Sequence, residues 1–258
     1  MIVCRSIAET REIIAGWHRE SEVVGLVPTM GYFHDGHLEL MRTSVTRTGK
    51  TVVSLFVNPT QFGPGEDLEV YPRDFDGDCA KAREVGVDLM FCPEPDDIYR
   101  TGHSTEVSVA GLAAGLCGAD RPGHFTGVAT VVTKLFNIVQ PDYAFFGEKD
   151  FQQLRIIHQL TRDLDFPISV VGVPIVREDD GLAMSSRNAY LSDKERREAL
   201  VSATRTLSRS PADARYEARV SPTPRQGRPR SRPCGPGGPA RRTRARRPRP
   251  GGPRPCRR

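Results

Sequence analysis

Residues 23–37 have the sequence VVGLVPTMGYFHDGH, in which a short apolar run is followed by a loop with glycines and two histidines. The run Val23–Val27 is apolar and rich in β-branched residues, which predicts a buried strand. A helix is predicted to begin near Gly36 or His37. His34 and His37 then lie three residues apart at the start of a helix that directly follows a strand.

The same alternation of strand and helix continues along the chain. Apolar runs predict strands at residues 51–57, 87–91, 143–146 and 168–176, and helical spacing predicts helices at residues 6–19, 75–85, 125–139, 151–164 and 192–207. Strands that are apolar throughout favour a parallel sheet with helices on both faces. We therefore predict a doubly wound α/β fold, in which ligands bind beyond the carboxyl ends of the strands where the strand order switches.

The first candidate site is the loop of residues 28–37. Backbone N–H groups and the dipole at a helix start favour phosphate. The imidazoles of His34 and His37 can donate hydrogen bonds to charge that develops on an α-phosphate, and Gly36 leaves room for a nucleotide. A histidine pair at this spacing is more often a solvated helix start, but its position after a strand and beside glycines favours phosphate binding.

Two amide side chains close the next predicted strand. Asn58 and Gln61 can bind the hydroxyls and carboxylate of a hydroxy acid without adding charge, although Asn-Pro also makes ordinary turns. Further along, Arg121 and His124 open a predicted helix, either as pocket residues or as a solvated helix start. None of these segments decides a function by itself.

Charged residues cluster after two later strands. Lys149 can place a point charge on a triphosphate, and Asp150 can accept a hydrogen bond from a ribose hydroxyl. The serines and arginine of residues 185–187 suit the oxygens of the outer phosphates and of a departing pyrophosphate, although the segment is also compatible with a polar surface loop.

Five segments resemble those of the pantothenate synthetases, a family of HIGH-type nucleotidyltransferases, both in their residues and in their order along the chain. The segments are PTMGYFHDGH at 28–37, NPTQF at 58–62, RPGHF at 121–125, FGEKDFQQ at 146–153 and REDDGLAMSSRN at 177–188. Phe33 stands where the family usually has leucine, an apolar exchange that leaves the chemistry unaffected. The resemblance covers about residues 1–210 and implies a Rossmann-like domain.

The resemblance implies a two-step reaction and its participants. ATP and (R)-pantoate would give pantoyl adenylate and diphosphate, and beta-alanine would then give pantothenate and AMP. Mg²⁺ would travel with the triphosphate, Asp78 being a possible outer contact, and the family is usually homodimeric.

The resemblance also implies a set of site residues. Catalysis would fall to His37, His34, Lys149 and Arg187. ATP would be bound by Met30, Gly31, Tyr32, Phe33, His34, Asp35, Gly36, His37, Gly147, Glu148, Lys149, Asp150, Val176, Met184, Ser185, Ser186 and Arg187. Pantoate or beta-alanine would be bound by Gln61, Gln153, Asn58 and Arg121.

Composition divides the chain near residue 210. Residues 211–258 hold fifteen arginines, eleven prolines and two acids, so the net charge of +5 leaves about −8 for residues 1–210. We expect this tail to be disordered, because it lacks the apolar residues of a core. It does not resemble the family's smaller C-terminal domain. The abrupt change favours a shifted reading frame or a misplaced gene end over an arginine-rich RNA-binding extension.

These features predict an organisation and a compartment. Residues 1–175 are expected to bind ATP and pantoate, 176–210 to form the phosphate loop and the start of a truncated domain, and 211–258 to form the tail. No cysteine lies at metal-ligand spacing, and no segment suggests a signal peptide or a membrane span, so a cytoplasmic protein without nucleic-acid or membrane partners is expected. The alternatives are a nucleotidyltransferase with another acceptor and an inactive remnant that binds RNA.

Overall fold

Six parallel strands form one sheet in the part of the chain that the structure describes. The computed structural model describes residues 1–207, with side chains up to residue 200. The sheet order is β1-β4-β3-β2-β5-β6. The strands are β1 (Ile2–Cys4), β2 (Val24–Thr29), β3 (Lys50–Leu55), β4 (Leu89–Phe91), β5 (Tyr143–Gly147) and β6 (Ser169–Val173). This arrangement confirms the predicted α/β fold with a parallel sheet.

The strand order switches direction between β2 and β5. From β2 the chain adds β3 and β4 on one side, and it then returns to place β5 and β6 on the other. Two loops therefore leave the carboxyl ends of adjacent strands in opposite directions, which is where doubly wound sheets bind ligands. The loop after β2 carries the two histidines, and the loop after β5 carries Lys149.

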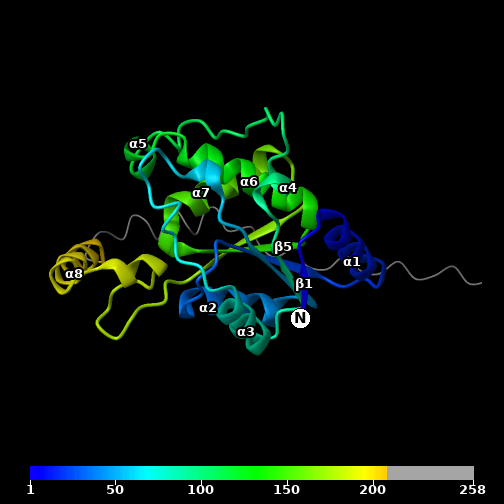
Figure 1. Cartoon of the computed structure of the whole chain (residues 1–258), viewed down its shortest axis with the longest axis horizontal. Helices are drawn as coiled ribbons and strands as arrows, with labels where there is room; N and C mark the ends of the chain where they lie inside the picture. The colour runs from blue at the N-terminus through cyan, green and yellow to red at the C-terminus, as the bar shows by residue number, and fades with distance from the viewer. Residues whose placement is uncertain (208–258) are drawn as a thin grey trace, which may run out of the picture. The chain divides into compact units, whose positions relative to one another are not determined.

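Helices cover both faces of the sheet (Figure 1). One face packs against α1 (Ile7–Arg19), α6 (His124–Val139) and α7 (Phe151–Asp163), and the other against α2 (Asp35–Arg47) and α3 (Phe75–Val85). Short helices α4 (Pro95–Ile98) and α5 (Cys117–Asp120), the 3-10 turns η1 (Pro59–Gln61), η2 (Glu148–Asp150) and η3 (Ser186–Tyr190), and α8 (Asp193–Leu207) complete the described elements. None of the helices in residues 1–207 is long and apolar enough to cross a membrane.

The predicted elements match the observed ones except at a few places. Strand β1 was not predicted, because three residues are too few for a periodic signal. Helix α6 begins at His124 with Gly123 as its left-handed N-cap, so Arg121 lies before the helix rather than in its first turn. One compact unit spans Met1–Arg209, and the predicted tail of residues 211–258 lies outside the described residues.

Candidate active site

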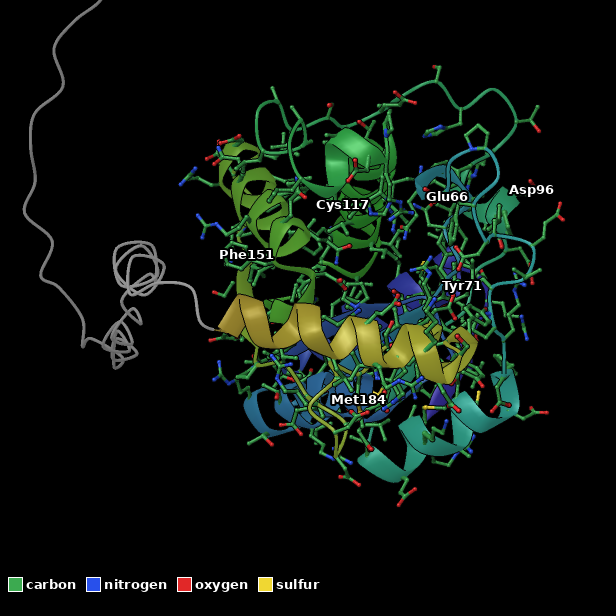
Figure 2. The ribbon with its side chains drawn as sticks, turned by 90° about the vertical axis from the view of Figure 1, so that its left-hand side faces the viewer. Glu66, Tyr71, Asp96, Cys117, Phe151 and Met184 are labelled. Atoms are coloured by element: carbon green, nitrogen blue, oxygen red, sulfur yellow. The ribbon has the colours of Figure 1, made fainter. Side chains whose placement is uncertain are left out.

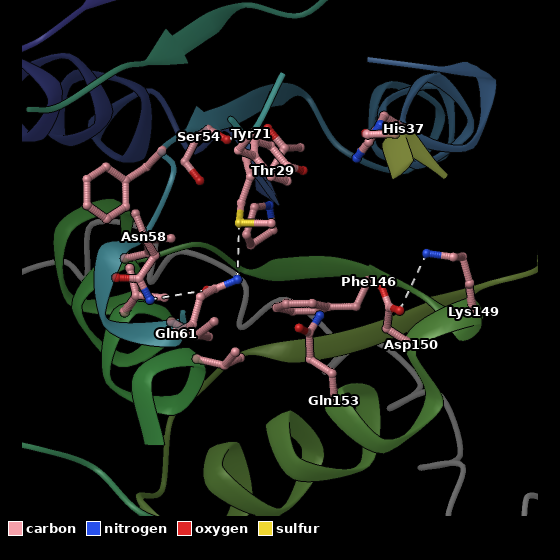
Figure 3. A pocket seen from close by; sticks show the side chains of 18 of the residues that line it. Thr29, His37, Ser54, Asn58, Gln61, Tyr71, Phe146, Lys149, Asp150 and Gln153 are labelled. Carbon is pink, nitrogen blue, oxygen red and sulfur yellow. Dashed lines mark hydrogen bonds and ion pairs between the residues drawn. The ribbon is translucent and has the colours of Figure 1, made fainter. Parts of the chain in front are cut away.

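A pocket opens at the carboxyl ends of β2, β3 and β5 and runs under helix α6. Figure 3 shows His37 and Lys149 at one end, called here the phosphate end, and Asn58 and Gln61 at the other, called the amide end. A second cavity shares the phosphate end and continues from it to Val176 and Met184. The apolar wall of the pocket consists of Pro28, Phe56, Val128, Val131, Val132, Leu135 and Phe146.

The two histidines line the phosphate end in a defined tautomer. His34 is the N-cap of α2, and its Nδ1 accepts a hydrogen bond from the N–H of Gly36 at 3.1 Å. The Nδ1 of His37 accepts from the N–H of His34 at 3.4 Å. A neutral imidazole that accepts on Nδ1 carries its proton on Nε2. Each ring therefore has an Nε2–H donor.

Both histidines are neutral at pH 7. Burial lowers the pKa of His37 to about 3, and the nearby His34 and Lys149 add to this effect. Burial also lowers the pKa of His34, with a further contribution from Lys149. The rings thus offer hydrogen-bond donors without fixed positive charge. The positive charge comes from Lys149, whose Nζ lies 3.6 Å from a carboxylate oxygen of Asp150 in the same pocket.

Two side chains of helix α3 hold the histidine loop from behind. The carboxylate of Asp78 accepts from the N–H groups of Tyr32 at 2.7 Å and Phe33 at 2.6 Å, and Lys81 donates to the carbonyl of Phe33 at 2.7 Å. Gly31 and Tyr32 have φ values of 89° and 54°, so the loop passes through the left-handed region just before His34. Because Asp78 is 1% exposed, this clamp lies inside the protein.

The amide end is built around Gln61. Buried Asn58 donates from Nδ2 to the side-chain oxygen of Gln61 at 3.1 Å and to the carbonyl of Gly127 at 3.2 Å. The Oδ1 of Asn58 accepts from the hydroxyl of Tyr99 at 2.7 Å. Asn58 therefore orients Gln61, whose Nε2 lies 3.1 Å from the sulfur of Met30. Gln153 lines the same pocket from helix α7.

Arg121 and His124 support the amide end from outside the pocket. Neither lines the pocket; both donate to the backbone carbonyl of Gln61, at 3.3 Å from Arg121 and 2.8 Å from His124. Glu66 pairs with Arg121 at 2.7 and 2.5 Å, and these hydrogen bonds lower the pKa of Glu66 to about 2. The structure thus places Arg121 behind Gln61 rather than in direct contact with a ligand.

The serine–arginine segment also contributes to the lining of the pocket. Ser185, Ser186 and Arg187 line it, and the guanidinium of Arg187 makes two hydrogen bonds of 2.8 Å to Asp67. The same guanidinium lies over the ring of Tyr71, 5.6 Å from its centroid. Figure 2 labels Glu66 and Tyr71, which belong to the loop that makes these contacts.

Some predicted ATP residues lie outside the two cavities. Phe33 is buried in the core between α2 and α3, Tyr32 is 38% exposed, and Gly31 lines a separate cavity. Neither Asp35 nor Glu148 lines the two cavities. Gly36 does line the second cavity, and a side chain there would meet the ring of His34 at 2.9 Å.

Sequence reasoning missed several residues of the pocket. It assigned no role to Tyr71, Ser54, Thr29 or the valines of α6, although all of them line the pocket. The valines follow from the helical spacing of residues 125–139, which identifies an apolar face but not what the face covers. Asp67 carried no signal, because an acid in a loop is commonplace.

The model of the pantoate-beta-alanine ligase family matches residues 2–225 of this chain. The chain belongs to this family. The pantothenate synthetase of Dinoroseobacter shibae is 56% identical over 194 residues, which are 75% of this chain and 69% of that protein. That of Geobacter sulfurreducens is 53% identical over 215 residues, which are 83% of this chain and 74% of that protein.

Solved structures of the ligase family agree with the fold. The crystal structure of the pantothenate synthetase from Thermus thermophilus matches with a TM-score of 0.74 at 52% identity, covering 78% of this chain and 71% of that one. The ligase from Francisella tularensis matches with a TM-score of 0.74 at 35% identity, covering 78% and 77%. That protein was crystallised in complex with beta-gamma ATP and beta-alanine.

Proposed function

We propose that this chain condenses (R)-pantoate with beta-alanine, using ATP and a pantoyl-adenylate intermediate, to give pantothenate, AMP and diphosphate. Membership of the ligase family supports the overall reaction. The observation that carries the mechanism is the division of one pocket into a phosphate end, with two imidazoles and the Lys149–Asp150 ion pair, and an amide end with Asn58 and Gln61. Adenylate formation needs both ends, because a triphosphate and a hydroxy acid must meet at one phosphorus atom.

In the first step, a carboxylate oxygen of pantoate attacks the α-phosphorus, and the bond from that phosphorus to the pyrophosphate oxygen breaks. Negative charge rises on the α-phosphate oxygens as the phosphorus becomes five-coordinate. The Nε2–H groups of His34 and His37 are suited to donate to these oxygens. Lys149 and Arg187 would neutralise the outer phosphates and the departing pyrophosphate.

In the second step, the amine of beta-alanine attacks the activated carbonyl, and AMP leaves with the electron pair of the carbon–oxygen bond. The ammonium nitrogen loses a proton as the amide forms. Pantoate would stay bound between Gln61 and Gln153 during both steps. Asn58 orients Gln61 through its side chain, and Arg121 and His124 do so through its backbone carbonyl.

The residues that the structure describes do not form a protein cage for Mg²⁺. No group of three or more His, Cys, Asp or Glu side chains that could hold a metal occurs in the described part of the chain. Asp78, the predicted outer contact, uses its carboxylate oxygens on the backbone of Tyr32 and Phe33. We therefore propose that the triphosphate brings its own Mg²⁺.

A cytoplasmic homodimer is the proposed setting. The cysteines Cys4, Cys79 and Cys92 are buried free thiols, which suits a reducing compartment. The family resemblance is the support for the dimer.

A different acceptor, such as a mononucleotide, is the competing proposal. A phosphorylated acceptor would need a cation at the amide end. Arg121, which donates to the backbone carbonyl of Gln61, is paired with Glu66 and does not line the pocket. Neutral Gln61 and Gln153 therefore favour an unphosphorylated hydroxy acid.

The test is diphosphate release from ATP by the full chain. Release that requires pantoate, and pantothenate that appears only when beta-alanine is added, would support the proposal. Release that requires a phosphorylated acceptor instead would overturn it.

A further inference from the structure

Ser54, near the carboxyl end of strand β3, has a buried hydroxyl without a hydrogen-bond partner. Its side chain is fully buried, and its Oγ has no partner in the protein. The backbone carbonyl of Ser54 accepts from the hydroxyl of Thr29 at 2.7 Å, but this contact leaves the Oγ unsatisfied. Burying an unpaired hydroxyl costs stability, so a position that could hold alanine here holds a residue that weakens the fold.

The sheet directs Ser54 toward the pocket. Side chains alternate along β3, and Val52 and Phe56, two residues to either side, belong to the core cluster that packs against α6. Ser54 therefore lies on the α6 face, where it lines the pocket. Figure 3 places it on the Asn58 side, away from Lys149.

Two other buried polar atoms of the described residues lack partners, namely Thr133 Oγ1 and Gln152 Oε1. Neither residue lines the pocket. Ser54 is thus the one of the three whose unused hydrogen-bonding capacity faces a space for a ligand. The pocket wall that α6 supplies is apolar, with Val128, Val131 and Val132.

We propose that the Ser54 hydroxyl binds an alcohol group of the hydroxy-acid substrate. This inference rests on the proposed function. The reacting carboxylate of pantoate must lie at the phosphate end, so its alcohols point toward the amide end and Ser54. A serine hydroxyl can both donate to and accept from an alcohol, and the valine wall suits the two methyl groups of pantoate.

The test compares Ser54→Ala with Thr133→Val, since each variant removes one buried, unpaired hydroxyl. Both variants are expected to be at least as stable as the parent chain in thermal unfolding. Ser54→Ala should lower kcat/KM for pantoate by about 3- to 10-fold, the loss of one neutral hydrogen bond. Its KM for ATP should not change, and Thr133→Val should leave both parameters unchanged. If the role of Ser54 were purely structural, Ser54→Ala would alter stability without a selective loss of kcat/KM for pantoate.

Substrate analogues identify the bonded group. One analogue lacks the alcohol next to the carboxylate, and the other lacks the terminal alcohol. The penalty of Ser54→Ala should disappear with the analogue that lacks the alcohol bound by Ser54. An unchanged kcat/KM for pantoate, or the same penalty with pantoate and both analogues, would overturn the inference while leaving the proposed function intact. If the parent chain shows no pantoate-dependent diphosphate release, both proposals fail.

Discussion

At the scale of single residues, the chemistry of the phosphate end depends on which nitrogen of each histidine carries the proton. The backbone settles this, because the N–H groups of His34 and Gly36 donate to the two Nδ1 atoms. His37→Ala should therefore remove one donor to the α-phosphate and slow single-turnover diphosphate release by about 10²-fold or more. The affinity for ATP should change less. An unchanged rate would exclude His37 from the mechanism.

The lowered pKa of His37 also predicts a pH effect on stability. The folded state favours the neutral ring of His37. The stability that His37 contributes is therefore present above its ordinary pKa of 6.5 and is lost as the pH falls toward about 3. Below pH 6.5 the unfolded chain binds a proton that the folded chain excludes. His37→Asn should therefore reduce the slope of the unfolding free energy against pH in this range. The reduction corresponds to at most one bound proton. Urea unfolding at several pH values measures the slope, and identical slopes would contradict the assignment.

Asp67 holds Arg187 through two hydrogen bonds of 2.8 Å, and Arg187 lines the pocket while Asp67 does not. Asp67→Asn should release the guanidinium of Arg187 from its fixed position in the pocket and so raise the KM for ATP. The expected increase is about 3- to 10-fold, a modest effect because the ion pair is partly exposed. Glu69→Gln is the matched control, because it removes the same charge from an exposed position in the same loop. Equal effects of the two variants would point to general charge loss instead.

At the scale of elements, the strands β2, β3 and β5 and the helices α3, α6 and α7 were predictable, because each is long and has one clear period. The geometry of the amide end was harder to predict from the sequence. It depends on Gly127 in α6, where a side chain would meet the carbonyl carbon of Thr60 at 2.6 Å and the nitrogen of Gln61 at 2.7 Å. Such a close approach of a helix to a distant turn leaves no periodic trace in the sequence.

Gly127→Ala should therefore separate α6 from the turn that carries Gln61. Overpacking of this kind costs about 1–3 kcal/mol of stability. Loss of the hydrogen bond from Asn58 to the Gly127 carbonyl should also weaken pantoate binding more than ATP binding. Gly115→Ala is the control, because a side chain there meets no atom within 4 Å. Calorimetric titration of both ligands gives the comparison, and equal weakening of the two would argue against a local effect.

At the scale of the whole molecule, the sequence indicated the site because the residues with catalytic or binding side chains occur in short segments that follow strands. His34, His37, Lys149 and Arg187 could be found in this way, and all four line one pocket. Arg121 could not be placed, because only the folded chain reveals that Glu66 and the carbonyl of Gln61 occupy its guanidinium. Ser54 gave no signal, since a serine within an apolar strand is ordinary until its neighbours are known.

The distribution of site residues gives a last prediction. Every residue proposed to bind ATP lies between Met30 and Arg187, within the compact unit Met1–Arg209. At ~0.15 M salt, a chain that ends at Arg209 should therefore keep the ATP affinity and the thermal stability of the full chain. Residues 211–258 carry a net charge of about +13, which attracts a polyanion at low ionic strength. This attraction is largely screened at ~0.15 M salt, where the Debye length is about 8 Å. The two chains should thus differ in ATP binding at low salt and converge as salt is added. A difference that persists at ~0.15 M salt would place a nucleotide contact beyond residue 209.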